Sequence, residues 1–561
     1  MKFIFNKWVI VYIILATFLF SARVFIFSTQ FGFELDSGWY LGVAKNFALR
    51  QKYASYTNTT ISEVPGSNPS IHNRFSVQDK NGFSHFPAGV TVGPGYVFPQ
   101  ALLIKLLGNG WWQYKLWPLF TLAFLFAILF YLAWFLGGIV SLFIVQVWLW
   151  FYPQIYLAYG FEALSESIAL LYLLLGFFFY FRFLVTKHKK WPLFVSGSFG
   201  GFSLLTKNIF VINVVAFAPI LLFRVVKKKK YLKSGFKEIA TFTTGFILPI
   251  FLFELYRFIY LFSNFGMAGY QAINKDIKLT MLSGGSGFGM HNSGTFNEFF
   301  LKKLLIFSDL GLGNTALLAW ILWLLVPIIF FTTLHKYKKE LAFLIYTSST
   351  TSFFWFSFMS PTGWARHIWQ GIVMGIIILS VSIGLIIKQK GYKLLKILLL
   401  LPFTIVFLKS LFSPLANPKF ILGKEDLLRW QAIPSYRGLQ GFPSSVFFPL
   451  KDQKEALEFF ENKISDKDRI YYDWWYLVAE LATITDKVFF PVDRYFLGQD
   501  DINPETKSYL IFGPYQMGEY SLTSPTYLSQ KTAKYCKVMV FRNNSYAACE
   551  LKERKLISSS D

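Results

Sequence analysis

Four carboxylates in two short segments are the first residues whose placement could do chemistry. Glu34 and Asp36 follow an apolar run, and Glu162 and Glu166 stand just before another. Facing carboxylates can act as a general base for an acceptor hydroxyl, or hold a divalent cation over a phosphate leaving group. Acids at helix starts also stabilise the helix dipole without a catalytic role, and Glu166 alone fits either explanation. The grouping of four acids favours catalysis.

Two cations outside the basic clusters of the chain suit a phosphate. Lys207 stands in a tight turn between two apolar runs, and Arg366 immediately precedes another. Arg offers bidentate hydrogen bonds and Lys a point charge, so the two together fit the phosphate or pyrophosphate of a lipid carrier. The alternative is that both side chains reach ordinary lipid phosphate. Glu254 and Arg257, three residues apart on one helical face, are expected to neutralise each other.

Three histidines are weaker candidates, for a metal site. His85, His291 and His367 are all expected on the external side, with acids nearby. Their spacing carries no ligand signature such as H-x-x-x-H, so a metal is a minor hypothesis. No cofactor is implied with certainty, and a divalent cation is left open.

These residues must be positioned by membrane-spanning helices. The chain of 561 residues is 54% hydrophobic and only 15% charged, against about 25% charged residues in a soluble protein. Its apolar residues form uncharged blocks of membrane-spanning length. The net charge of +24 gathers in short lysine clusters between these blocks. That distribution is typical of cytoplasmic loops, and it argues against a nucleic-acid partner.

The basic clusters predict a topology of about eleven transmembrane helices with a cytoplasmic N-terminus. The stretch 92–108 must be an interfacial helix rather than a span, because otherwise the lysine clusters near residues 187 and 227 would face outward. The predicted spans are approximately 8–27, 116–136, 138–153, 166–185, 192–206, 209–223, 239–262, 314–332, 341–358, 368–387 and 394–412.

Three regions are expected outside the membrane on the external side. Residues 28–115 form a large first loop with interfacial helices, and residues 263–313 form a second large loop. Residues 413–561 alternate helical and strand-like patterns, which predicts a small α/β domain. Its "CKVMVFRNNSYAACEL" segment reads as a hairpin with Cys536 facing Cys549. An external compartment permits a disulfide there, and two free thiols remain the alternative.

Five short motifs follow one another along residues 8–412. They are Asp36 four residues before Tyr40, a "GPGY…LLG" helix, Pro153 ahead of Ser165–Ser167, "LLTK" at 204–207, and the pair Arg366-His367. Each motif is short, and it is their order along the chain that makes the set specific. With these motifs, residues 8–412 resemble the GT-C superfamily of polytopic glycosyltransferases, in the branch of the protein O-mannosyltransferases and the lipid A aminoarabinose transferase.

The resemblance implies sugar transfer from a polyprenyl-phosphate donor to a glycolipid, polysaccharide or protein acceptor, with inversion, on the outer face of the inner membrane. Asp36 would be the catalytic carboxylate, supported by Glu34, Glu162 or Glu166. The donor phosphate would be neutralised by Lys207 and Arg366.

Two motif neighbours, Tyr40 and His367, are expected to contact substrate. The family often has Asp-Glu where this chain has Asp36-Ser37, and its Arg-Tyr is Arg366-His367 here. A transporter or flippase of lipid-linked saccharides is the main alternative, although no internal repeat supports it. A third reading is a non-catalytic assembly protein of the cell envelope.

Overall fold

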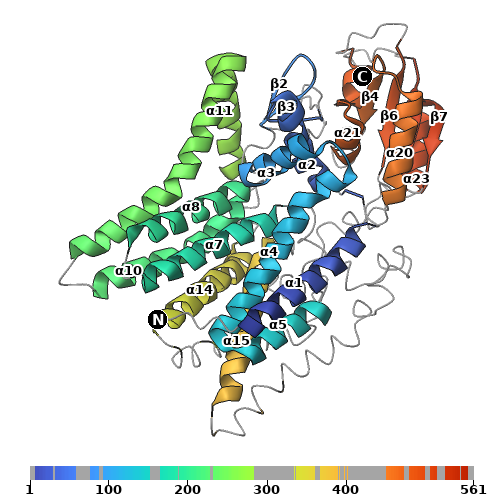
Figure 1. Cartoon of the computed structure of the whole chain (residues 1–561). Helices are drawn as coiled ribbons and strands as arrows, with labels where there is room; N and C mark the ends of the chain where they lie inside the picture. The colour runs from blue at the N-terminus through green and yellow to red at the C-terminus, as the bar shows by residue number, and fades with distance from the viewer. Residues whose placement is uncertain are drawn as a thin grey trace.

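A computed structural model shows an apolar helical bundle with smaller elements and a mixed sheet gathered at one end (Figure 1). The structure describes residues 7–29, 32–33, 35–57, 76–86, 93–151, 165–186, 189–227, 232–282, 336–359, 367–389, 450–472, 479–498, 506–513, 525–543 and 545–553, and single positions 327, 334, 391, 397 and 401.

Long apolar helices build the bundle, because inside a membrane every backbone polar group must be paired within the segment. The bundle helices are α1 (Lys7–Ser28), α4 (Trp111–Gly137), α5 (Ile139–Phe151), α7 (Glu166–Val185), α8 (Lys190–Thr206), η1 (Asn208–Phe210), α9 (Val211–Val214), α10 (Phe217–Lys227), α11 (Leu232–Leu282), α14 (Lys336–Phe358) and α15 (Trp369–Lys388). Six apolar stretches in the described part of the chain are long enough to cross a membrane: Lys7–Ile26, Trp111–Gly137, Glu166–Val185, Asn208–Val226, Lys233–Asn274 and Trp369–Lys388. The chain is therefore a multi-pass membrane protein.

The predicted spans agree with these helices to different degrees. Helix α7 coincides with the predicted span 166–185, and the stretches 192–206 and 341–358 lie within the helices α8 and α14. The predicted spans 314–332 and 394–412 lie almost wholly outside the described residues. The number of eleven spans therefore stays a prediction.

Hydrogen bonds between helix ends support the alternating direction of the helices. Lys388 Nζ donates to the Gly137 carbonyl over 2.8 Å, which joins the last residues of α15 and α4. Lys338, near the start of α14, donates to the carbonyl of Phe135 in α4. At the other end of α4, Lys115 donates to the carbonyl of Ser28, the last residue of α1. The side of the membrane that each end faces stays a prediction.

Helix α11 is longer than the sequence indicates. The predicted loop begins at residue 263, whereas the structure continues helical to Leu282 across a break at Gly266. Gly266 adopts φ 68° and ψ −175°, which a residue with a side chain rarely adopts. Beyond the break, Ile273 is buried in a cluster with residues of the first loop, so this part of the helix is held by packing that the sequence pattern does not reveal.

Two short helices and a small sheet lie at the end of the bundle where the first loop is found (Figure 1). They are α2 (Leu35–Arg50), α3 (Pro94–Leu107), β1 (Ala54–Ser55), β2 (Val77–Gln78) and β3 (Ser84–His85). The strands pair antiparallel in the order β1-β3-β2. Helix α3 is the helix predicted for residues 92–108, starting with Pro at its first position and ending at Gly108 with φ 94°.

The C-terminal elements form a five-stranded sheet in the order β5-β4-β6-β8-β7. Strand β4 lies parallel to β5 and β6, and β8 runs antiparallel to β6 and β7. The elements are α20 (Leu450–Lys463), β4 (Arg469–Tyr472), α21 (Ala479–Thr485), β5 (Phe489–Pro491), α22 (Val492–Phe496), β6 (Ser508–Phe512), α23 (Pro525–Tyr535), β7 (Cys536–Arg542) and β8 (Ala547–Leu551). We call this unit the α/β domain; its predicted start near 413 lies outside the described residues.

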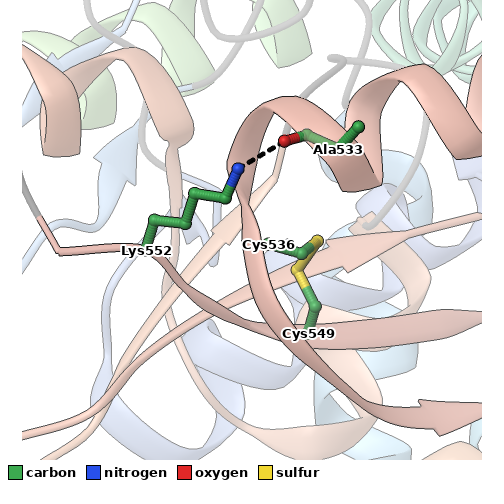
Figure 2. The surroundings of a disulfide bond; sticks show 4 residues. All are labelled: Ala533, Cys536, Cys549 and Lys552. Atoms are coloured by element: carbon green, nitrogen blue, oxygen red, sulfur yellow. Dashed lines mark hydrogen bonds between the residues drawn. A yellow bond between two sulfur atoms is a disulfide. The ribbon is translucent and has the colours of Figure 1, made fainter.

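A disulfide joins the last two strands of this sheet (Figure 2). Cys536 and Cys549 are bonded with their Cα atoms 5.6 Å apart. The cysteines are diagonal neighbours rather than opposite ones, because Cys549 pairs with Met539 in the ladder and Cys536 with Leu551. The predicted hairpin is present, and its turn is closed by Asn543 N–H donating to the Tyr546 carbonyl over 2.8 Å.

Candidate functional site

Several predicted site residues lie outside the described part of the chain. They are Glu34, Glu162, His291 and Arg366, together with the side chain of Asp36. The backbone of Asp36 is in the first turn of α2. The catalytic role of Asp36 and the phosphate role of Arg366 therefore stay predictions, and the described residues around α2 define what the site can do.

A buried ion pair is the centre of the described site. Lys207 Nζ lies 3.0 Å from Glu166 Oε1, and the side chains are 9% and 0% exposed. Two charges so far from water persist only as a pair, since removal of one partner leaves the other buried and uncompensated. The structure thus brings together an acid and a cation that lie 41 positions apart in the chain.

Two helix ends place this pair. Glu166 is the first residue of α7, where the positive end of the helix dipole favours a carboxylate. Lys207 is the residue after the end of α8, where the negative end favours a cation. Ser165, just before Glu166, adopts the left-handed conformation with φ 67°. A buried non-glycine residue in that conformation marks a backbone constrained by its surroundings.

Tyr40 connects the ion pair with the helix that carries Asp36. Lys207 Nζ donates to Tyr40 Oη over 3.3 Å and lies 5.7 Å from the centre of its ring. The Tyr40 ring packs edge-on against Tyr96 of α3, with 5.9 Å between the ring centres. Tyr40 follows Asp36 by four residues, about one helical turn, on α2. Helices α2, α3, α7 and α8 therefore converge on Lys207.

Glycines let α3 approach the end of α8. A Cβ atom on Gly93 would lie 2.0 Å from the Leu205 carbonyl oxygen, and one on Gly95 would lie 1.9 Å from Thr206 Oγ1. The Gly95 carbonyl also accepts a hydrogen bond from Tyr172 Oη over 3.2 Å. The "GPGY" and "LLTK" motifs of the sequence are thus packed directly against each other. Their contact fixes the position of Lys207 relative to α2.

Several buried polar atoms at the starts of α2 and α7 have no hydrogen-bond partner among the residues the structure describes. They are Glu166 Oε2 and the hydroxyls of Ser37, Ser165 and Ser167. Buried polar groups normally have a partner, in the protein, water or a ligand. This set of acceptors and hydroxyls is suited to a polar ligand or an ion beside Lys207. Ser37 occupies the position where the resembled family often has Glu.

His85 is committed to protein contacts on both sides of its ring. Its Nε2 lies 3.1 Å from Asp79 Oδ2, and its Nδ1 lies 2.9 Å from Tyr260 Oη in α11. Lys52 Nζ also pairs with Asp79 Oδ2 over 2.6 Å. Burial lowers the pKa of His85, although Asp79 opposes this shift. Neither ring nitrogen is left for a metal, and the described residues contain no group of three potential ligands.

The remaining sequence candidates have structural partners. His367 packs against Trp355 with 6.3 Å between ring centres, and its carbonyl accepts a hydrogen bond from Gln370. Arg257 pairs with Glu254 over 2.5 Å, as the sequence predicts. Arg257 Nη2 also donates to Asn274 Oδ1 over 2.9 Å, which links the two parts of α11.

A further buried cation, Lys45 of α2, was not predicted from the sequence. Lys45 is 1% exposed and donates to the Thr483 carbonyl of the α/β domain over 2.8 Å. Its Nζ lies 3.5 Å from Asp486 Oδ1, and Arg50 pairs with the same carboxylate over 2.7 Å. Burial would raise the pKa of Asp486, but the hydrogen bond from Arg50 and the charge of Lys45 lower it on balance. No local pattern could have identified partners more than 400 positions away.

Comparison with known proteins identifies the fold. No protein-family model and no curated protein matches the chain. The chain is similar to ArnT from Cupriavidus metallidurans bound to undecaprenyl phosphate, with a TM-score of 0.56 and 11% identity over 99% of each chain. It is also similar to the apo structure of that ArnT, with a TM-score of 0.51 and 11% identity over 95% of this chain and 97% of that chain. The chain has the GT-C fold of ArnT, which confirms the fold resemblance drawn from the motifs.

Proposed function

We propose that this protein is a glycosyltransferase of the inner membrane that moves a sugar from a polyprenyl-phosphate donor to an acceptor on the outer face. The observation that carries the proposal is the buried Lys207–Glu166 pair, which lies beside Tyr40 of the helix bearing Asp36. ArnT from Cupriavidus metallidurans, which shares this fold, binds undecaprenyl phosphate. A lipid phosphate is the ligand for which a buried cation at the end of a membrane helix is suited.

In the proposed reaction the acceptor hydroxyl attacks the anomeric carbon of the sugar. The new carbon–oxygen bond forms as the bond to the phosphate oxygen breaks, and the configuration inverts. Asp36 takes the proton of the hydroxyl, and the polyprenyl phosphate leaves with the electron pair.

The cations act on the charge that develops on the leaving phosphate. Lys207 supplies a fixed charge within hydrogen-bond reach of that phosphate, and Arg366 supplies a second one. Glu166 and Tyr40 hold the Lys207 ammonium in place before the donor arrives. The incoming phosphate then competes with Glu166 for Lys207.

Purified protein in lipid nanodiscs tests the proposal. Undecaprenyl-phosphate-linked mannose, glucose and 4-amino-4-deoxyarabinose would each be offered with lipid A, polysaccharide and protein acceptors, and released undecaprenyl phosphate would be measured. We expect release with one donor, and a loss of about 10²–10⁴-fold in Asp36→Asn if this carboxylate is the base. Lys105→Gln, an exposed cation of α3, is the matched control and should stay at the wild-type rate. Equal release by wild type and Asp36→Asn contradicts the site assignment.

A further inference from the structure

The α/β domain contacts the chain both before and after Asp36. Before Asp36, the side chain of Gln453 in α20 holds the backbone of Phe33. Gln453 Oε1 accepts from Phe33 N–H over 2.8 Å, and Gln453 Nε2 donates to the Phe33 carbonyl over 2.6 Å. This two-point contact fixes a residue only three positions ahead of Asp36, as a neighbouring strand would.

The contact requires a glycine next to it. A Cβ atom on Gly32 would lie 2.1 Å from Gln453 Oε1. Phe33 is 2% exposed, and its ring stacks on Trp111 with 5.5 Å between centres. The segment is thus held by its backbone on one side and by its ring on the other, and Gln453 supplies the polar half of that hold.

After Asp36, helix α21 of the α/β domain packs directly on α2. Thr483 Oγ1 donates to the Gly38 carbonyl over 2.8 Å. A Cβ atom on Gly38 would lie 2.3 Å from Glu480 Cα, and one on Gly42 would lie 2.5 Å from Thr483 Oγ1. Two glycines one turn apart allow the close approach of these helices, on the side of α2 away from Tyr96 and Lys207.

A buried chain of hydrogen bonds joins the two contacts. Gln453 Nε2 donates to Tyr546 Oη over 3.1 Å, and Tyr546 Oη donates to Glu480 Oε1 over 3.1 Å. Gln453, Glu480 and Tyr546 are each at most 1% exposed. Such a chain keeps its members in one arrangement, because any shift leaves buried polar atoms unpaired. The positions of Phe33 and Gly38 are therefore set by one rigid network.

We propose that the α/β domain is a working part of the catalytic site, in which Gln453 and Thr483 are positioning residues that fix the segment 33–38 and thereby Asp36. This inference rests on the proposed function, in which Asp36 is the base. A displacement of about 1 Å at a reacting group can reduce the rate about 10²-fold. The polar contacts at Phe33 and Gly38 act on the position of Asp36, whereas Lys207 lies at the end of α8 and is also held by Glu166 of α7.

Gln453→Leu removes both contacts to Phe33 and nearly conserves the side-chain volume. The full-length protein in nanodiscs would be mixed in excess with the undecaprenyl-phosphate sugar it turns over fastest. A loss of positioning lowers the single-turnover rate constant, about 10-fold or more, at an unchanged amplitude and an unchanged affinity for undecaprenyl phosphate. Loss of folded protein would instead lower the amplitude at an unchanged rate constant, and that result overturns the proposal.

Three further variants sharpen the test. Gln453→Glu keeps an acceptor for Phe33 N–H and should recover part of the rate. Gly32→Ala forces Gln453 aside and should resemble Gln453→Leu, and the two changes together should cost less than the sum of their separate effects. Glu458→Gln, an exposed change on the same helix, should match the wild type. Additive effects of Gly32→Ala and Gln453→Leu contradict a shared contact.

Hydrogen exchange separates this inference from the proposed function. Amides of residues 32–42 should exchange faster in Gln453→Leu than in the wild type or Glu458→Gln. If the wild type releases no undecaprenyl phosphate, the proposed function fails, and faster exchange still demonstrates that Gln453 fixes the segment. Unchanged exchange in Gln453→Leu overturns the positioning role whatever the activity.

Discussion

Lys207 and Glu166 form a buried ion pair in which each residue lies at the end of a helix. Each sits at the helix end whose dipole favours its charge, and each neutralises the other where water is excluded. A phosphate that approaches Lys207 also approaches Glu166, which repels it. Binding of a lipid phosphate therefore calls for further positive charge, which Arg366 is predicted to supply.

Substitution of one partner should separate stability from binding. Lys207→Met leaves Glu166 buried without its cation and should lower the free energy of unfolding by about 3–5 kcal/mol. Glu166→Gln combined with Lys207→Met removes both charges and should restore most of that loss. Thermal melting of the protein in nanodiscs measures the first effect.

The same double variant isolates the role of the cation. Its affinity for undecaprenyl phosphate should stay at least about 10-fold weaker than that of the wild type, since a charge-assisted hydrogen bond of about 1.5–3 kcal/mol is lost. Recovery of both stability and binding would show that Lys207 has only a structural role.

At the scale of elements, close backbone contacts between helices fix the position of the site. Helix α3 reaches the end of α8 through Gly93 and Gly95, and α21 reaches α2 through Gly38 and Gly42. The two approaches clamp α2 between the bundle and the α/β domain. These four glycines therefore have a structural role, because they allow the helix contacts that position the part of α2 containing Tyr40 and Asp36.

The two glycines of α3 should respond differently to the same change. In Gly95→Ala the new methyl group meets Thr206 Oγ1 at 1.9 Å, whereas in Gly93→Ala it meets the Leu205 carbonyl at 2.0 Å. Thr206→Ala should therefore rescue part of the activity and melting temperature of Gly95→Ala but none of those of Gly93→Ala. Each single change should cost about 1–3 kcal/mol, in the range of overpacked sites. Equal rescue of both contradicts the backbone contact.

The buried carboxyl of α21 should make the stability of the protein depend on pH. Burial raises the pKa of Glu480 from its ordinary 4.5 to about 7. The folded state thus keeps a proton that the unfolded state releases, so the free energy of unfolding falls as the pH rises from about 4.5 to 7. Glu480→Gln should remove this part of the slope, on the order of 1–3 kcal/mol, while the exposed Glu458→Gln keeps it. If the melting temperatures of the wild type and of Glu480→Gln depend on pH in the same way across this range, this role of Glu480 is contradicted.

At the scale of the whole molecule, the sequence predicts features that have a local pattern along the chain. It does not predict contacts between residues that are far apart in the sequence. Uncharged apolar blocks and lysine clusters predict α7 to the residue and a separate helix at α3, because membrane burial imposes a simple pattern. The sequence identifies Glu166 and Lys207 as separate site candidates, but it does not indicate that they form an ion pair. The contacts of Gln453 and Lys45 follow from tertiary packing alone, and the extension of α11 past Gly266 depends on partners in the first loop.

The central claim concerns one bond, between the sugar and the phosphate of a polyprenyl carrier. The most direct test follows that bond in a single turnover of the wild-type protein in nanodiscs, with both the sugar and the lipid labelled. The account predicts that each mole of undecaprenyl phosphate released is matched by one mole of sugar on the acceptor, and that both fall together in Asp36→Asn. Movement of the intact lipid-linked sugar across a sealed bilayer, without cleavage of this bond, would contradict it and identify a flippase instead.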